Sequence, residues 1–427
     1  MTEEFLTHLW KYGLFDRTSL ISDTGEKIEV ISLGEHNSNS GPDFIQAKIR
    51  IGNTLWAGNV ELHLNASDWK KHNHQTDKAY DNVILHVVMK ADQTTKRTNG
   101  TIIPTVELGF DPTLYRNYIV LIGNRNRIAC HDYIARIDTL LLHSWLSSVM
   151  VERLEGKVKS LEELLEQFQG NWDEIFYIRL AQSFGFHLNA VPFEQVARSL
   201  PLNTLVRHDN NLFQLEAMLF GQAGFLAGEG MDEYTSRLQE EYDHLRKKYN
   251  LKPVDQHLWK FMRLRPVNFP TVRLAQFAAL VHALPGLFRK ILETENPATL
   301  VKLFSVRPSG YWRTHYKLGI VSAAREKTLG EDSCRILLIN TVIPVLFLYG
   351  LKRGDEKLKN RAIEFLSHLP PEKNAVITRW DKAGVRAGSA LDTQALLQLW
   401  SAYCQRKRCL RCMVGSRIIT GNGMGNR

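Results

Sequence analysis

A short segment between Gly41 and Val88 concentrates side chains that bind metal ions or carry protons. Asp43 follows a proline, and Glu61 and His63 stand two residues apart in a sequence that alternates like a β-strand. Because side chains alternate between the two faces of a strand, Glu61 and His63 are expected on one face, with Asp43 on a neighbouring strand within reach. Two carboxylates at one place repel each other unless a cation lies between them, and Mg²⁺ or Mn²⁺ prefers such ligands. These three residues are therefore the candidate catalytic and metal-binding residues. The alternative is that Asp43 caps a turn after Pro42, Glu61 pairs with an arginine and His63 faces solvent.

A second polar group, His72, His74 and Asp77, follows directly. If this segment is extended, His-x-His suits Zn²⁺ or Mn²⁺. If it is helical, His74 and Asp77 share a face and His72 does not. The alternative interpretation is a polar helix that faces water and binds nothing. His86 lies in an apolar run, which favours a hydrogen-bonded core residue over a metal ligand.

Three cysteines near the end of the sequence have a spacing typical of metal ligands. Cys404, Cys409 and Cys412 form Cys-x4-Cys-x2-Cys, in a chain with five cysteines and no secretion signal, so a disulfide framework is not expected. Three thiolates need a fourth ligand, and the candidates are Cys130, which we favour, His131 and Cys334. The site would take Zn²⁺ or an iron–sulfur cluster. The alternative is three ordinary thiols at the end of a helix.

The basic residues are unevenly distributed. Residues 1–150 hold 15 Lys and Arg against 17 Asp and Glu, whereas residues 151–427 hold 39 against 28. This balance suggests an anionic partner such as nucleic acid, although a solvated basic surface explains it equally well. The candidate nucleic-acid-binding residues combine cations with an aromatic ring for stacking, and they are Arg263, Arg265, Arg273, Arg307, Trp312, Arg406 and Arg408. The alternative for the clusters around Arg273 and Trp312 is a structural corner with satisfied guanidinium groups.

The elements that must position the first group read as an α/β module. A helix is expected over 3–15, followed by strands over 27–34, 44–52 and 55–65, a short helix or ordered loop over 67–82, and strands over 83–90 and 101–109. Pro104 places the last strand at a sheet edge.

After about residue 130 the pattern becomes helical. Helices are expected over 140–168, 173–184, 194–199, 211–220, 232–249, 272–283, 287–292, 333–348, 355–368 and 393–404. The fold class is therefore α+β, with an α/β module over 1–128, an α-helical region over 129–399 and a cysteine-containing tail over 400–427. The apolar run 336–350 predicts a buried core helix broken or kinked at Pro344, not a membrane span. We expect a cytoplasmic protein with no membrane association, and the sequence does not indicate its oligomeric state.

The order helix, three strands, helix, strand resembles the αβββαβ core of the PD-(D/E)xK nucleases. Pro42-Asp43 matches the first part of their motif, and Glu61-Leu62-His63 stands where acid-x-Lys is expected. His63 replaces the lysine, so it would act as a general base or an additional ligand, or it would mark a lost activity. The resemblance implies a Mg²⁺- or Mn²⁺-dependent nuclease. The alternatives are a non-catalytic nucleic-acid-binding or scaffold protein on a degenerate nuclease-like core, and a metal hydrolase of small substrates.

A second resemblance covers nearly the full length. The stretches GPDF, GNVELHLNASDW, AYDNVILHVV, EAMLFGQAGFL, RLRPVNFPTVRLAQ, INTVIPVLFLYG and YCQRKRCLRCMVG are similar to those of an uncharacterised bacterial family, domain of unknown function 2851. This resemblance implies a family and adds no catalytic residue to those named above.

Overall fold

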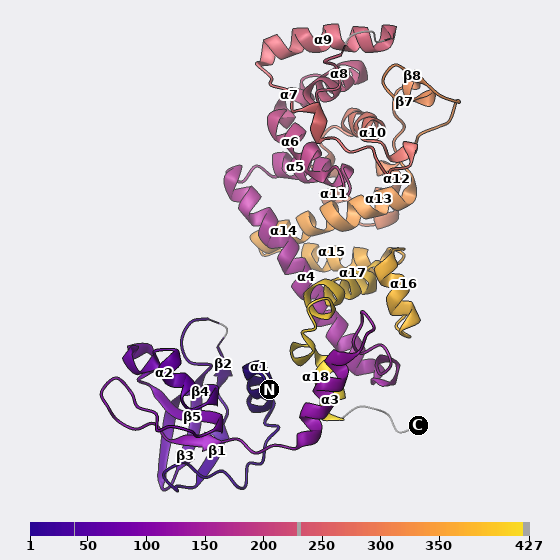
Figure 1. The fold of residues 1–427 in the computed structure, drawn as a ribbon. Helices are drawn as coiled ribbons and strands as arrows, with labels where there is room; N and C mark the ends of the chain where they lie inside the picture. Colours follow the sequence, from indigo (N-terminus) through magenta and orange to yellow (C-terminus); the bar gives the residue numbers. More distant parts are fainter. Residues whose placement is uncertain (38, 229–231, 422–427) are drawn as a thin grey trace. The chain divides into compact units, whose positions relative to one another are not determined.

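The computed structural model describes residues 1–37, 39–228 and 232–421. The chain forms two compact units (Figure 1). The first comprises residues 1–146, 378–385 and 398–427, so the end of the chain belongs to the same unit as its beginning. The second comprises residues 147–377 and 386–397 and is helical. The protein is thus a mixed α/β chain with an N-terminal mixed sheet and a large helical region.

The first unit is built on a six-stranded mixed sheet. Its strands are β1 (Ile28–Ser32), β2 (Glu35–His36), β3 (Phe44–Ile51), β4 (Thr54–Asn65), β5 (Val83–Lys90) and β6 (Thr105–Glu107). The order is β1-β3-β4-β5-β6, with β2 also paired to β3. Strands β1, β3 and β4 are antiparallel, whereas β4, β5 and β6 are parallel. β6 ends the sheet, as predicted from Pro104.

The sequence explains which residues of this sheet are buried. β3 alternates buried and exposed residues, whereas β5 is buried from Val83 to Val88, as a continuous apolar run requires. Helix α1 (Glu3–Tyr12) buries Phe5 and the other apolar residues of one face, and it begins at Thr2, whose side chain accepts the Phe5 N–H. Both α1 and the short helix α2 (Asp68–Lys71) pack against β4.

A β-bulge in β3 lies just after Asp43. Phe44 pairs with Val60 and Ala47 with Gly58, so β3 carries one more residue than β4 between these pairs. Gln46 accommodates the extra residue with a φ of 59°. Bulges locally bend a strand and redirect its side chains. This one fixes how the start of β3, and with it Asp43, meets β4.

The rest of the first unit comes from both ends of the sequence. Helix α3 (Pro112–Gly123) contacts α18 (Met413–Thr420), and the 3₁₀ turn η9 (Cys409–Arg411) contacts α1. The backbone carbonyl of Leu410 lies 3.0 Å from His8 Nδ1, and Asn117 Nδ2 donates to the carbonyl of Ile419 at 3.0 Å. The C-terminal segment therefore packs on the N-terminal module.

The helical part of the chain follows the predicted pattern, with several additions. Its longer elements are α4 (Thr139–Gln167), α5 (Trp172–Phe184), α6 (Ala190–Ser199), α7 (Leu202–Val206), α8 (Leu212–Gln222), α9 (Glu233–Tyr249), α10 (Pro270–Ala283), α11 (Leu287–Glu293), α12 (Pro297–Phe304), α13 (Glu331–Leu337), α14 (Ile343–Arg353), α15 (Glu356–His368), α16 (Ala375–Lys382) and α17 (Ala390–Gln398). Sequence reasoning did not predict α3, α7, α12, α16, α18 or the small hairpin of β7 (His315–Lys317) and β8 (Ile320–Val321).

The most apolar helix is continuous and carries a local irregularity. Residues Glu331–Arg353 run through α13, a π-helical turn η7 (Leu338–Val342) and α14, and Pro344 lies in the first turn of α14. The π turn precedes the proline, whose missing N–H cannot bond to the preceding turn. By length and composition this run could cross a membrane, but 67% of its most apolar stretch is buried inside the protein, as in a core helix.

Candidate metal centre

Asp43 and Glu61 are held together by reciprocal backbone contacts. The Asp43 N–H donates to Glu61 Oε2 at 3.0 Å, and the Leu62 N–H donates to Asp43 Oδ2 at 3.0 Å. Each carboxylate is therefore anchored on the neighbouring antiparallel strand. The structure brings these two sequence-predicted acids to one place.

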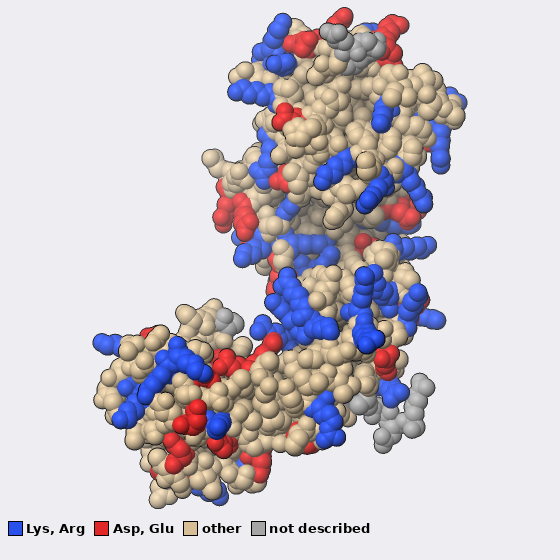
Figure 2. Space-filling model, in the orientation of Figure 1, with Lys and Arg blue, Asp and Glu red and all other residues tan. Residues whose placement is uncertain are grey.

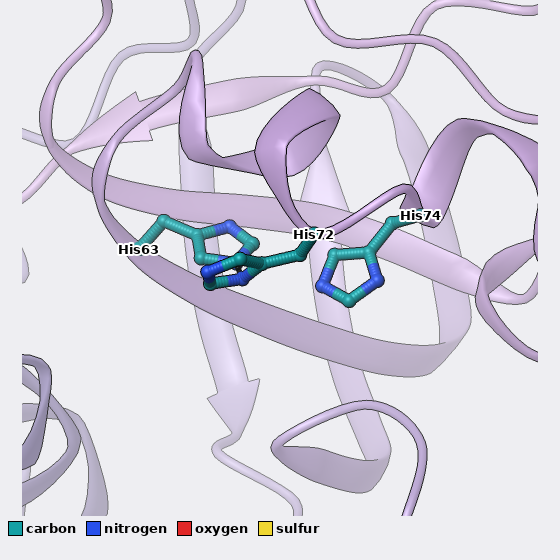
Figure 3. A group of neighbouring side chains, drawn as sticks. All are labelled: His63, His72 and His74. Atoms are coloured by element: carbon teal, nitrogen blue, oxygen red, sulfur yellow. Dashed lines mark hydrogen bonds between the residues drawn. The ribbon is translucent and has the colours of Figure 1, made fainter.

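Three histidines converge beside Glu61 (Figure 3). His63 comes from β4, whereas His72 and His74 follow α2 on either side of Asn73, whose φ of 60° turns the chain. Their ligand nitrogens all lie within 4.8 Å of one another. His63 Nε2 lies 3.0 Å from His72 Nδ1. A cation at this point would be surrounded by imidazole nitrogens.

Glu61 adds an oxygen to this group. Its Oε1 lies 3.7 Å from His63 Nε2 and 3.4 Å from His74 Nε2. His63, His74 and Glu61 are buried, with 1%, 8% and 5% of their surface exposed, whereas His72 is exposed. The group is therefore reached from solvent on the side of His72.

A hydrogen-bonded chain behind His63 fixes its ring. His63 Nδ1 lies 2.9 Å from His86 Nε2, and His86 Nδ1 lies 3.0 Å from Thr95 Oγ1. His86 is fully buried, as expected of a hydrogen-bonded core residue. Such partners determine which ring nitrogen carries the proton and orient a ligating imidazole. The chain leaves His63 Nε2 facing His72 and Glu61.

Burial keeps the inner histidines neutral. Loss of solvent, followed by the nearby imidazoles, lowers the pKa of His63 to about 2. Loss of solvent also lowers the pKa of His86 to about 3. A neutral imidazole has a lone pair available for a metal ion, whereas an imidazolium has none. At neutral pH His63 is therefore suited to act as a ligand.

The acids show the opposite effect. Burial, and then the negative charge of Glu61, raises the pKa of Asp43 to about 7, against the Leu62 N–H that favours the carboxylate. Burial also raises the pKa of Glu3, at the start of α1, which interacts electrostatically with His72, Asp68 and Glu61. Two carboxyl groups crowded at one buried place need a proton or a cation.

Aromatic rings close the inner side of the group. Tyr80 stacks on His74 with ring centroids 3.7 Å apart, and the ring of Trp69 meets His74 edge to face and His86 at a tilt. Trp69 is itself fixed by its Nε1–H, which donates to the carbonyl of Lys96 at 3.1 Å. The histidines are thus held by packing as well as by hydrogen bonds.

Asp77 lies outside this group. Its carboxylate accepts the Ala79 N–H at 2.9 Å and caps a 3₁₀ turn, and its side chain is exposed. The structure therefore gives Asp77 a capping contact in place of the predicted ligand contact. Conversely, sequence reasoning missed Glu3 and Tyr80, because nothing in their local sequence indicates that they face β4.

All four predicted cysteines line one small cavity. Cys130, Cys404, Cys409 and Cys412 face a space of about 20 Å³, together with Arg408 among other residues. The two other candidates for the fourth ligand lie elsewhere: His131 is paired with Asp132 at 2.9 Å, and Cys334 is buried in the second unit.

Two of the predicted nucleic-acid contacts are corrected by their burial. Arg273 is 6% exposed, and its guanidinium donates to Gln276, Asn268 and Ser333. Trp312 is fully buried and stacks on Phe220. Both residues are core residues, because a side chain without exposed surface cannot contact a phosphate or a base. The segments around Arg273 and Trp312 therefore have a packing role.

The remaining basic candidates lie at or near the surface. Arg263, Arg265 and Arg406 are exposed, and Arg307 pairs with Glu326 at 3.2 Å. Arg408 is half-buried beside the cysteine cavity. Figure 2 shows basic side chains in several groups over the face drawn, with acidic side chains between some of them. The positive charge is thus spread over the surface shown.

Comparisons with known proteins identify a family and no relative of known activity. The model of a family described as a protein of unknown function (DUF2851) matches residues 3–375. No curated protein and no solved structure matches the chain.

Proposed function

The chain belongs to the DUF2851 family of proteins of unknown function, and we propose that its N-terminal site is the centre of a Mn²⁺-dependent phosphodiester hydrolase that acts on nucleic acid. One observation carries the proposal. The nitrogens of His63, His72 and His74 lie within 4.8 Å of one another, with Glu61 Oε1 3.4–3.7 Å from two of them. Among the described residues, these three histidines form the group of three or more metal-binding side chains whose ligand atoms lie this close together.

The ligand chemistry favours Mn²⁺ over Mg²⁺. Mg²⁺ takes oxygen ligands and keeps its waters, whereas imidazole suits transition metals. Three imidazoles and one carboxylate would fill a four-coordinate ion. A six-coordinate ion would keep two positions, one for water and one for a phosphate oxygen. An ion held in this way lowers the pKa of its bound water and neutralises charge on a phosphate.

Asp43 is the residue best placed to accept a proton. It contacts Glu61 through its backbone, and a cation held by Glu61 would favour the carboxylate form of Asp43, which is the form that accepts a proton. The Leu62 N–H holds one carboxylate oxygen in place at 3.0 Å. Asp43 would therefore take the proton of the attacking water while Glu61 and the histidines hold the ion.

Nucleic acid is the proposed substrate for two reasons. Residues 151–427 carry 39 basic against 28 acidic residues, so a polyanion would be attracted to them. The paired acids, Asp43 just before β3 and Glu61 on β4, also resemble the arrangement in PD-(D/E)xK nucleases. This likeness is an analogy of element order and supports the substrate class only.

A non-catalytic metal site is the second candidate, and a specific observation favours it. Glu61, His63 and His74 are buried, and together with His72 they would satisfy a tetrahedral Zn²⁺ without any water. Structural zinc sites are closed in this way, whereas catalytic sites keep an open position. In that case the ion would stabilise the module, and the chain would act as a scaffold.

The two candidates are separated by one set of assays on the full chain. The metal content is measured after purification, and cleavage of labelled single- and double-stranded DNA and RNA is measured with Mn²⁺, Mg²⁺ or Zn²⁺. We expect cleavage that depends on Mn²⁺ and falls roughly 10²–10⁴-fold in Asp43→Asn, the range for loss of a general base. Bound Zn²⁺ with no cleavage under any condition would favour the scaffold.

The matched control is Glu29→Gln. Glu29 lies on β1 of the same sheet, but it is exposed and pairs with Arg50 at 3.1 Å. Glu61→Gln should abolish metal binding and cleavage, whereas Glu29→Gln removes the same charge and should change neither. Equal losses in both variants would mean that the activity depends on the charge of the module and not on this site.

A further inference from the structure

The four cysteines of the first unit come from distant parts of the sequence. Cys130 lies in a turn after α3, Cys404 ends the π-helical turn η8 (Leu399–Cys404), Cys409 begins η9, and Cys412 immediately precedes α18. All four line the same cavity and none forms a disulfide. The two segments that meet there are about 270 residues apart in the sequence, so chance proximity along the chain does not explain the group.

Every pair among the four thiols interacts electrostatically. Cys130 interacts with the other three, Cys404 with Cys409 and Cys412, and Cys409 with Cys412. Cys130 and Cys412 are buried and Cys404 and Cys409 are partly buried, and all four line one cavity, where a metal centre would bind them as thiolates.

Four cysteines that line one cavity are the ligand set of a single Zn²⁺ ion as well as of an iron–sulfur cluster. With Zn–S bonds of about 2.3 Å, tetrahedral ligands lie about 3.8 Å apart. The four thiols line a cavity of about 20 Å³, which would have to widen to admit a cluster core. Cubane iron–sulfur clusters separate their cysteine ligands by the core of iron and sulfide.

Hydrogen-bond donors surround the sulfur of Cys412. The backbone N–H groups of Val414 and Gly415, at the start of α18, and the side chain of Trp145 favour the thiolate of Cys412. Donors to the ligand sulfurs are a feature of iron–sulfur sites, where they tune the cluster.

The surrounding charge suits an anionic centre. Four thiolates around a 4Fe–4S core of charge +2 leave a net charge of −2. The cavity lining contains Arg408 and no acidic residue. Lys407 lies nearby, with its Nζ donating to the carbonyl of Ile122 at 2.5 Å.

We propose that Cys130, Cys404, Cys409 and Cys412 hold a 4Fe–4S cluster that fastens the C-terminal segment to the N-terminal module. The four thiols lose four protons on binding, and two ferrous ions, two ferric ions and four sulfides supply the core. The cluster is structural: it joins the turn after α3 to η9 and α18. The site is separate from the histidine centre and does not depend on the proposed hydrolase.

The test uses the full chain purified without oxygen from iron-supplemented cells. Iron, zinc and acid-labile sulfide are measured, and the visible absorbance and the electron paramagnetic resonance spectrum after reduction with dithionite are recorded. We expect close to four iron and four sulfide per chain, with the broad visible absorbance of a cluster. Zinc without sulfide would overturn the cluster in favour of a single ion, and a chain without metal would overturn the site.

Variants assign the ligands. Cys409→Ser, at a partly exposed position, and Cys130→Ser should each lose most of the sulfide, whereas Cys334→Ser, in the second unit, should retain it. His72→Ala should also retain it, which separates this site from the histidine centre. Sulfide that survives in both ligand variants would refute the assignment. If the variants do not fold, the iron, zinc and sulfide content of the wild-type chain still shows whether a cluster is bound.

Discussion

Replacing Asp43 with asparagine should stabilise the metal-free protein at high pH. In the folded chain burial and Glu61 raise the pKa of Asp43 from 3.8 to about 7. Between these two pKa values the folded chain keeps the proton on Asp43 and the unfolded chain does not. The free energy of unfolding therefore falls as the pH rises from about 4 to 7. Asparagine keeps the oxygen that accepts the Leu62 N–H and cannot ionise. It therefore removes the cost of burying a charged carboxylate.

The size of the effect follows from the shift. A shift of about 3 units corresponds to about 4 kcal/mol, and relaxation of the partly accessible site reduces this to about 2–3 kcal/mol. At pH 5 most of the Asp43 carboxyls in the folded protein are protonated, so the two proteins should differ by less there. At pH 8.5 the variant should be more stable by the full amount. Added Mn²⁺ should reduce this difference, because a cation bound by Glu61 and the histidines favours the ionised carboxylate of Asp43 in the wild type.

The assay must report on the first unit, since a chain with two compact units need not unfold in one step. Hydrogen exchange of peptides that cover β3 and β4, measured by mass spectrometry against urea at pH 5, 7 and 8.5 in chelator, gives the local free energy of unfolding. Glu29→Gln is the control and should show no pH-dependent gain. A wild-type profile that is flat from pH 5 to 8.5, or a variant that is less stable at every pH, would refute the reasoning.

Three further outcomes are expected. Burial lowers the pKa of Lys157 to about 7, so above pH 7 the unfolded chain binds a proton that the folded chain has lost. The free energy of unfolding of the second unit should therefore rise by roughly 1.4 kcal/mol per pH unit between pH 7 and 10. Denaturation curves of Lys157→Met should not show this rise. In Gly415→Ala the new Cβ would lie 2.1 Å from the carbonyl oxygen of Cys409, so calorimetry should show a loss of about 1–3 kcal/mol, whereas Gly109→Ala, with open space around it, should melt like the wild type. If the second unit binds nucleic acid, fluorescence anisotropy should show affinity falling steeply with salt, and a flat salt dependence would remove nucleic acid as a partner.

The sheet of the first unit was predictable because its signals are local. The alternation in β3, the apolar run of β5 and Pro104 before β6 each indicate a strand directly. The pairing of Glu61 with His63 on one face follows from strand geometry. What could not be predicted is the tertiary placement of Glu3, since its position over β4 depends on how α1 packs and not on its neighbours in sequence.

The same contrast holds for the ligand groups. The spacing Cys-x4-Cys-x2-Cys already brings three thiols together, and the structure adds Cys130 to the same cavity. For the histidines, periodicity was misleading: both the helical and the extended readings of residues 72–77 assumed one regular conformation. The chain instead turns at Asn73 in the left-handed region, so His72 and His74 approach His63 together while Asp77 caps the next turn. The exposed or buried state of Arg273 and Trp312 likewise depends on packing that composition does not reveal.

The identity of residue 63 decides what chemistry this site can perform. The nuclease motif places lysine there, a side chain whose ammonium group positions water or neutralises charge. His63 is 1% exposed, it is linked to His86 on one nitrogen and faces His72 on the other, and its pKa is lowered to about 2. Such an imidazole neither carries a positive charge nor takes up a proton at neutral pH, so it cannot replace the lysine as an acid or as a base. A neutral His63 can still offer a nitrogen lone pair to a metal ion. If the site is catalytic, His63 must then bind the ion, and the proton of the attacking water must go to another group, for which Asp43 is the nearby carboxyl with a pKa close to neutral.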